Sequence, residues 1–579
     1  MAKNVAEKLV DTLEEAGVKR IYAVTGDSLN KVNDAVRENG KIKWVHVRHE
    51  ETGAFAAGAE AQLTGKLACC AGSSGPGHVH LINGLYDAHR SGAPVLAIAS
   101  TIPTDQFGTG YFQETDTIRL FDDCSYYNQV ATTPYELPRM LQAAMQTAIS
   151  EKGVAVIGVP GDVTFKNEEE VDSSQRFFPT YQRTVPSVTE IEELAALLNG
   201  AEKVTLFCGI GAKDAHMELV RLSQLLHAPV AYSFKSKMEI QYDNPNEVGL
   251  TGLLGMPSGY DSMHEADVLL MLGTDFPYNA FLPDHNKIVQ IDIKANRLGR
   301  RAKLKMGLCG DVRETLRLLL PSIRQKTDDA FLRTQLAQYR KVRELFESTA
   351  KEKGKENNIQ PEYVTFVLNE LASDDAIFTV DTGMSCVWGA RYLQATGKRK
   401  MLGSFNHGSM ANAMPQAIGA ALAYPDRQVI AMCGDGGLSM LLGDLATIAE
   451  YKLPVKLIVY NNRNLGMVKL EMEVAGIPDN ETGMHNPDFS RVAMAAGIPG
   501  YNVSKPEDVF PVLTKALLME GPVLVNIMTD PNALALPPHI EFSQMLGFAH
   551  TMYRMMLTGR SKDVLDTIHT NIKHLKEVL

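Results

Sequence analysis

Hydrophobic and polar positions along this chain alternate between short apolar runs and longer amphipathic stretches. Apolar, β-rich runs lie at 20–26, 66–73 and 93–100, with helical patterns between them. Strands that alternate with helical patterns are typical of βαβ units and therefore of a parallel sheet. We expect a first α/β domain over residues 1–180, which ends in a linker within the polar, proline-containing stretch 166–187.

The same pattern restarts twice further along the chain. The runs of the second series are 203–211, 266–275 and 286–293, and those of the third are 374–383, 427–437, 454–462 and 521–530. They predict α/β domains over 188–335 and 336–530, joined by a charged helical segment at 328–358. The expected fold is three doubly wound parallel-sheet domains, of which the first and third could be duplicates. Such folds bind ligands at the carboxyl ends of their strands.

Residues 531–579 form a tail beyond the third domain. Apolar side chains at helical spacing alternate there with charged ones: Val564, Leu565, Ile568, Ile572, Leu575 and Leu579 opposite Lys562, Asp566, Lys573 and Lys576. This pattern predicts an amphipathic helix, and the stretch before it, 545–560, is apolar and rich in methionine. Packing on the protein's own core and binding to a membrane surface are both open to such a helix.

Composition narrows the possible functions. The chain has 579 residues and a net charge of -11, without a basic stripe of the kind that follows a phosphate backbone, so nucleic acid is not an expected partner. The first residues predict an amphipathic helix rather than a secretion signal, and no apolar run is long enough to span a bilayer. Seven scattered cysteines without disulfide or metal-ligand spacing fit a reducing cytoplasm.

Two segments that follow predicted strands carry candidate metal ligands. Asp435 lies in GDGG (434–437), and Asn462 lies in YNNRN (460–464). Mg²⁺ prefers oxygen ligands and usually takes one or two from the protein and the rest from phosphate or water, which suits this pair. Glycines at this point let backbone N–H groups approach phosphate oxygens. In isolation, each segment would more often be a simple turn.

Together, at this spacing, the two segments resemble the metal-binding motif of thiamin diphosphate enzymes. This resemblance implies that Asp435, Asn462 and the backbone carbonyl of Asn464 hold Mg²⁺ and that Gly436 and Gly437 meet the diphosphate. It also implies that Gly408, Ser409 and Met410 line the cofactor from the preceding loop, with Met410 as the apolar wedge that keeps it bent.

Glu50 is the candidate for the carboxylate that activates thiamin diphosphate. That activation requires a carboxylate hydrogen-bonded to the aminopyrimidine ring. In residues 44–61 a predicted strand runs directly into a helix of small and apolar residues, with Glu50 at the junction. Complementing the helix dipole is a sufficient explanation for Glu51. The pattern resembles the pyrimidine-binding domain of the same enzymes, which implies that Glu50 is the proton relay. The resemblance also implies that the active site lies between two subunits and that the chain forms a homo-oligomer, commonly a tetramer.

Six segments resemble the flavin-dependent pyruvate oxidases, and among them the quinone-linked, acetate-forming group: 24–30, 73–90, 108–115, 273–278, 403–420 and 465–472. By this resemblance Phe112 and Gln113 face the substrate and His80 is a pocket residue. Met467, Val468 and Glu471 lie over the thiazolium, although relatives often carry Phe in place of Met467. The residues assigned to FAD are Thr251, Gly252, Leu253 and Leu254, then Thr274, Asp275, Phe276, Pro277 and Tyr278, and Asp292 at the adenosine ribose.

The resemblance implies oxidative decarboxylation of pyruvate to acetate and CO₂, with electrons passing through FAD to ubiquinone or menaquinone. It also implies that the tail binds a lipid surface reversibly, so that the protein is cytoplasmic and associates with the inner face of the cell membrane. Two enzymatic alternatives stay open: a phosphate- and oxygen-dependent pyruvate oxidase that makes acetyl phosphate and hydrogen peroxide, and an acetolactate synthase. A non-catalytic flavin- or lipid-binding scaffold is the alternative from another class.

Overall fold

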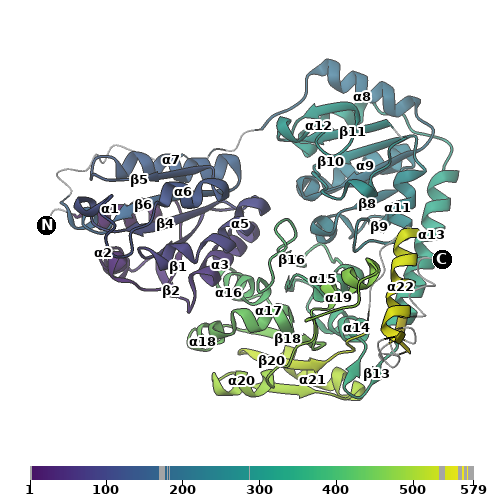
Figure 1. The fold of residues 1–579 in the computed structure, drawn as a ribbon. Helices are drawn as coiled ribbons and strands as arrows, with labels where there is room; N and C mark the ends of the chain where they lie inside the picture. The colour runs from purple at the N-terminus through teal and green to yellow at the C-terminus, as the bar shows by residue number, and fades with distance from the viewer. Residues whose placement is uncertain are drawn as a thin grey trace.

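Three parallel sheets, each of six strands, form the body of the protein (Figure 1). The computed structural model describes residues 3–167, 177–178, 180, 183–285, 287–533 and 542–557, together with 564–565, 567 and 570–571. Each sheet has helices on both faces, so its central strands are buried on both sides and are continuously apolar, as parallel sheets require. The predicted fold class is confirmed.

The first sheet has the strand order β2-β1-β3-β4-β6-β5. Its strands are β1 (Arg20–Ala23), β2 (Lys43–His46), β3 (Ala68–Gly72), β4 (Val95–Thr101), β5 (Tyr127–Val130) and β6 (Val154–Pro160). Its helices are α1 (Val5–Glu15), α2 (Asn30–Asn39), α3 (Glu50–Thr64), α4 (Pro76–Val79), α5 (Ile82–Ser91), α6 (Thr117–Phe121) and α7 (Leu137–Glu151). Helix α3 is buried almost all round because it lies between the first and third domains.

The third sheet repeats the order of the first, as β16-β15-β17-β18-β20-β19. Its strands are β15 (Ile377–Val380), β16 (Lys400–Gly403), β17 (Val429–Gly434), β18 (Val455–Asn461), β19 (Gly500–Val503) and β20 (Val523–Met528). Its helices are α14 (Pro361–Leu371), α15 (Met384–Tyr392), α16 (Ala413–Ala423), α17 (Asp435–Met440), α18 (Leu445–Glu450), α19 (Gly466–Val474), α20 (Phe489–Ala495) and α21 (Val509–Leu518). The shared strand order agrees with the idea that the two domains are duplicates.

The middle sheet has a different order, β12-β11-β10-β7-β8-β9. Its strands are β7 (Val204–Cys208), β8 (Val230–Tyr232), β9 (Glu247–Leu250), β10 (Val268–Leu272), β11 (Lys287–Asp292) and β12 (Leu304–Cys309). Its helices are α8 (Val188–Gly200), α9 (His216–Leu226), α10 (Lys237–Ile240), α11 (Pro257–His264) and α12 (Val312–Leu319). Numbered along the chain, this is the 3-2-1-4-5-6 order of dinucleotide-binding folds, in which ligands bind where the order reverses, here between β7 and β10.

The domains share apolar cores, which fix their arrangement. Helix α13 (Ala330–Ala350) and the small hairpin of β13 (Gly354–Lys355) and β14 (Asn358–Ile359) connect the middle and third domains, and one core runs through both. A second core joins the first and third domains across α3 and α16. Helices α3 and α16 cross very closely: a methyl group added at Gly419 would overlap the carbonyl oxygen of Ala56 and lie 2.8 Å from the carbonyl carbon of the same residue.

The described part of the tail packs on the third domain (Figure 1). Helix α22 (Phe542–Leu557) contains residues 545–557 of the predicted methionine-rich stretch, and Met552, Met555 and Val564 form a small buried cluster with Phe548. Of the predicted amphipathic helix, Val564 and Leu565 lie within the described residues, and the other predicted positions lie outside them. None of the helices in the described segments is long and apolar enough to cross a membrane.

Candidate active site

A cavity of about 230 Å³ opens at the carboxyl ends of β15, β17 and β18. It brings together nine of the predicted site residues: Gly408, Met410, Asp435, Gly436, Gly437, Asn462, Asn464, Met467 and Val468. Residues that follow β15 line it too, and these were not predicted: Thr382, Gly383, Met384, Ser385 and Trp388. The lining that the structure describes contains no residue of the first domain.

Asp435 is a buried carboxylate that only neutral groups contact. It follows β17 directly and is 3% exposed. Its Oδ1 accepts the N–H of Gly436 at 3.1 Å, and its Oδ2 accepts the N–H of Arg463 at 2.8 Å and the Nδ2–H of Asn486 at 2.7 Å. Burial raises the pKa of Asp435 to about 6. Because a buried carboxylate without a cationic partner is unfavourable, this position fits a divalent metal ion.

Asn462 lies beside Asp435 because β17 and β18 are neighbouring parallel strands. Its Oδ1 accepts the N–H of Asn464 at 3.0 Å, which closes a tight turn in which Arg463 has a φ of +57°. An amide oxygen has two lone pairs, so this bond leaves one for a metal ion. The side chain of Asp435 and this turn are held together by the bond to the backbone of Arg463, as a shared metal site requires.

Asp381 ties together the two loops that form the cavity floor. It follows β15, is 1% exposed, and accepts the N–H of Gly434 at 3.1 Å and of Ala413 at 3.2 Å. Burial raises its pKa to about 7. A methyl group at Gly437 would overlap its Oδ2, so the close fit of loop 434–437 depends on glycine. Asp381 was not predicted as a site residue, although an aspartate directly after an apolar strand was the same signal that identified Asp435.

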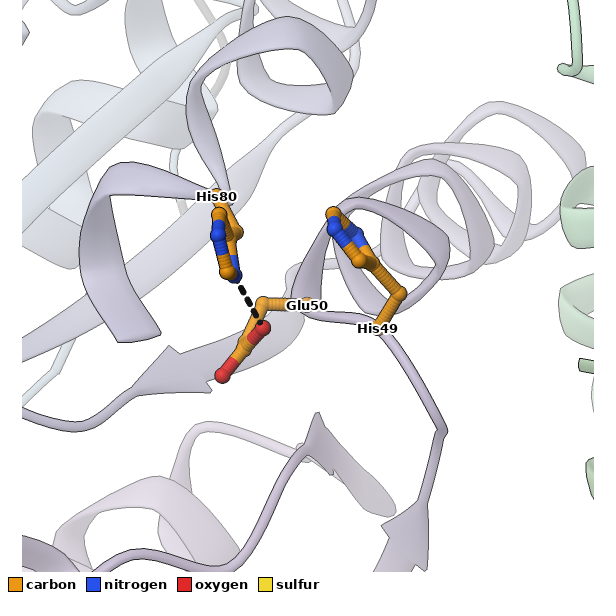
Figure 2. Close-up of side chains that lie close together, drawn as sticks. All are labelled: His49, Glu50 and His80. Atoms are coloured by element: carbon orange, nitrogen blue, oxygen red, sulfur yellow. Dashed lines mark hydrogen bonds and ion pairs between the residues drawn. The ribbon is translucent and has the colours of Figure 1, made fainter. Parts of the chain in front are cut away.

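Glu50 begins α3 and is fixed by an imidazole (Figure 2). His80 Nδ1 lies 2.9 Å from Glu50 Oε2, and the rings of His49 and His80 stack with centroids 4.5 Å apart. His49 caps the helix, since its Nδ1 accepts the N–H of Glu51 at 3.2 Å. The ligand atoms of His49, Glu50 and His80 lie within 4.8 Å of one another, a spacing that a metal ion could also use. The imidazole–carboxylate bond accounts for this geometry without one.

Phe112 and Gln113 lie in a loop of the first domain that is largely open to solvent. The side chain of Phe112 is 79% exposed, and Gln113 has a φ of +64°. The Oγ–H of Ser74 donates to Gln113 Oε1 at 2.9 Å. Within one chain, therefore, the residues predicted for the thiamin site form two groups: those of the first domain, including Glu50 and His80, and those that line the cavity of the third domain.

Helix α19 covers the cavity and contacts the tail. Met467 and Val468 line the cavity, whereas Glu471 on the same helix is exposed. Helix α22 packs against α19, and the Oγ–H of Thr551 donates to the carbonyl of Glu473 at 2.8 Å. The tail therefore rests on the helix that supplies two of the predicted site residues.

Loops of the middle domain form a cradle at the point where its strand order reverses. The N–H of Gly211, after β7, donates to the carbonyl of Gly273, after β10, at 3.0 Å. Gly252 has a φ of +98°, and a methyl group there would lie 2.8 Å from Phe276 Cζ. The buried Oγ of Thr251 has no hydrogen-bond partner among the described residues. This close-fitting cradle with an unpaired buried hydroxyl fits the pyrophosphate of a dinucleotide.

The remaining predicted flavin residues have distinct surroundings. Asp292 ends β11, is 3% exposed and accepts the N–H of Lys294 at 2.9 Å, and burial raises its pKa. Asp275 forms ion pairs with Arg300 and Arg301, so its backbone rather than its carboxylate is available to a ligand. The other members, Leu253, Leu254, Thr274, Pro277 and Tyr278, lie in the two loops that follow β9 and β10.

Helix α15 links the predicted flavin loops to the cavity of the third domain. Tyr278 lies close to Cys386 and Glu471, whose charged forms raise its pKa further after burial, the main cause. The buried guanidinium of Arg391 donates to the carbonyls of Leu254 at 3.4 Å and Gly255 at 3.5 Å. Because Arg391 belongs to α15, the helix whose first turn lines the cavity, one helix connects the predicted flavin loop with the predicted thiamin site.

Family models match all three domains. The N-terminal TPP binding domain of thiamine pyrophosphate enzymes matches residues 3–120, the central domain matches 191–319, and the C-terminal TPP binding domain matches 381–527. The matches follow the three sheets of the structure in order.

Curated relatives align over nearly the whole chain. A putative thiamine pyrophosphate-containing protein, YdaP of Bacillus subtilis, is 36% identical over 99% of both chains. The pyruvate oxidase of Lactiplantibacillus plantarum is 32% identical over 90% of this chain and 87% of its own. A probable acetolactate synthase large subunit of Methanocaldococcus jannaschii is 30% identical over 92% of this chain and 93% of its own.

Proposed function

The chain belongs to the thiamine pyrophosphate enzymes, and from this premise we propose that it decarboxylates pyruvate oxidatively to acetate and CO₂ and passes the electrons through FAD to a membrane quinone. Thiamin diphosphate, when bound, supplies the carbanion that attacks the keto carbon and holds the electron pair left by CO₂. In this proposal Asp435, Asn462 and the Asn464 carbonyl hold Mg²⁺, and the glycines at 436 and 437 admit the diphosphate.

Glu50 of a second copy would complete the cavity. Glu50, His80, Phe112 and Gln113 all belong to the first domain, which contributes nothing to the described lining of the cavity in its own chain. Phe112 is too exposed for a large apolar side chain that acts in a dry site, unless another copy covers it. Glu50 would hold the proton at the pyrimidine ring, with His80 fixing its carboxylate. This arrangement requires a homo-oligomer, which we propose is a tetramer.

One observation favours an oxidase over a non-oxidative enzyme: Arg391 of α15, a helix that lines the cavity with its first turns, donates to the carbonyls of Leu254 and Gly255 in the predicted flavin loop that follows β9. FAD would accept two electrons there. Water would then complete the release of acetate. A flavin held by these loops would be linked to the cavity through α15 and would supply the electron acceptor that an oxidase requires, whereas a condensation with a second keto acid needs no acceptor.

The tail supports the proposal that the electron acceptor is a quinone in the membrane. Helix α22 contacts α19, while Met556 is 47% exposed and Leu565 is 65% exposed. A methionine-rich helix that is partly docked and partly exposed can exchange its own core for a lipid surface. We propose that the tail attaches the enzyme reversibly to the inner face of the cell membrane, where quinone is available.

The test is anaerobic addition of pyruvate to the purified holoenzyme, followed through the visible flavin absorbance. We expect bleaching, acetate as the product, and faster reoxidation by quinone in liposomes than by oxygen. If acetyl phosphate and hydrogen peroxide form, and only in the presence of phosphate and oxygen, the protein is instead a phosphate- and oxygen-dependent pyruvate oxidase. If acetolactate forms while the flavin stays oxidised, the protein is instead an acetolactate synthase. An active Glu50→Gln variant would argue for a non-catalytic role of the site residues.

A further inference from the structure

Asn83, on α5, joins two segments that the proposed function assigns to different active sites. Its Nδ2 donates to Glu51 Oε1 at 2.7 Å and to Ser409 Oγ at 2.9 Å. Its Oδ1 lies 2.9 Å from Nε2 of His407, which is the donor in this pair. Both amide hydrogens and one lone pair of the oxygen are therefore used, and all three partners belong to other elements.

One face of α5 holds the loop that follows β16. Residues 83, 86 and 90 recur at helical spacing on that face. The Tyr86 ring stacks on His407 with centroids 5.5 Å apart, and Asn406 Nδ2 donates to the carbonyl of Arg90 at 2.9 Å. The loop position that Asn83 contacts, 409, lies between two residues that line the cavity.

The other partner, Glu51, follows Glu50 in the first turn of α3. The bond to Asn83 holds the Glu51 carboxylate, and this in turn fixes the turn that presents Glu50. Only a side chain with two donors and one acceptor at this length satisfies Glu51, Ser409 and His407 together. An aspartate in its place would bring two carboxylates into contact, and an alanine would leave all three groups without this partner.

We propose that Asn83 is a positioning residue that couples the active sites of two copies of this chain. The inference rests on the proposed two-copy site, in which Glu50 serves the partner's cavity while Gly408 and Met410 line the cavity of their own chain. Asn83 connects these two elements within one chain. The position of loop 404–410 in one cavity and the turn that presents Glu50 to the neighbouring cavity therefore depend on the same side chain.

Hybrid oligomers test the coupling. Two differently tagged chains are co-expressed, one with Asp435→Asn and the other with Glu50→Gln. The only competent site then uses Glu50 of the first chain and the cavity of the second. Activity of this hybrid, with both homo-oligomers inactive, establishes the two-copy site. An inactive hybrid refutes that part of the proposed function, and with it the inference.

Asn83→Ala is then placed on either chain. On the chain that supplies Glu50, it should lower kcat about tenfold and leave the cofactor Kd unchanged, since the loss of these hydrogen bonds is of that order. On the chain that supplies the cavity, it should raise the cofactor Kd about tenfold. Asn33→Ala on α2, whose side chain makes a 3.4 Å bond to Thr25, is the matched control and should change neither value.

Equal effects from both placements, or no effect on the chain that supplies Glu50, would overturn the coupling. If Asn83→Ala lowers the yield of folded protein, Ser409→Ala on the chain that supplies Glu50 breaks the same link from its other end. That variant should also lower kcat without changing the cofactor Kd. An unchanged kcat there would contradict the proposal as directly.

Discussion

Replacing Gly437 by alanine tests whether the cavity floor depends on the close approach of two loops. The added methyl group would overlap Asp381 Oδ2 and lie 2.7 Å from its Cγ and 3.0 Å from the N of Ala411. Asp381 cannot swing aside freely, because it is 1% exposed and accepts two backbone N–H groups. Loop 434–437 must therefore shift by about 1 Å to reach an ordinary van der Waals separation.

Overpacking of this kind typically costs about 1–3 kcal/mol. The shift falls on the loop that would carry the metal ligand Asp435, so we expect the loss mainly in cofactor binding, as a rise of about 5–150-fold in the Kd for thiamin diphosphate and Mg²⁺. The assay is titration of the apoenzyme, followed by protein fluorescence, beside thermal unfolding of the same preparations.

The matched control is Gly443→Ala in the same domain, where an added methyl group would approach only Arg48 Cβ, at 3.9 Å. It should bind cofactor as the wild type does. A Gly437→Ala variant with wild-type cofactor affinity would refute the reasoning, since the loops would then tolerate separation. Equal losses in both variants would show that any added methyl group weakens the domain.

Three further predictions concern other parts of the molecule. Asp435→Asn should weaken Mg²⁺-dependent cofactor binding by roughly 100-fold or more while the fold is retained, and EDTA should reproduce the loss in the wild type until Mg²⁺ is restored. Gly252→Ala should release flavin, because its methyl group meets Phe276, whereas Gly200→Ala, with open space around it, should not; absorbance after gel filtration reports the difference. Burial raises the pKa of Asp87 to about 6. Between about pH 4 and 6 the folded chain therefore holds a proton that the unfolded chain has released, so the stability of the wild type should fall as the pH rises through that range. Asp87→Asn should remove this decline, by up to roughly 3 kcal/mol, in thermal unfolding across those pH values.

The sequence was informative about candidate site residues where a polar residue directly follows an apolar strand. Asp435 and Asn462 were predicted to meet because strands of a parallel sheet end at one edge, and β17 and β18 are indeed neighbours. The long central strands were predictable for a related reason: they are buried on both faces and therefore continuously apolar. Edge strands such as β5 and β12 were not identified, because their exposed faces carry polar residues.

Contacts between distant segments could not be predicted in the same way. Asn83 and Ser409 are far apart in the sequence, and neither stands in a pattern that indicates the other. Asp381 gave a local signal, but its role depends on which loops surround it in space. The separation of Glu50 from the cavity of its own chain was expected only through the family resemblance, because it depends on how the first domain packs on the third.

The crossing of α3 and α16 has a consequence for how the enzyme exchanges its cofactor. These are equivalent helices of two domains with the same strand order, and they meet through alanine and glycine backbone with no space at Gly419. A seam of this kind cannot slide without overlap, so the two domains move as one body. The cavity therefore does not open by a hinge between them. Release of the cofactor must wait for the surrounding loops or the tail to move away, which makes retention of the cofactor a matter of slow kinetics as well as of affinity.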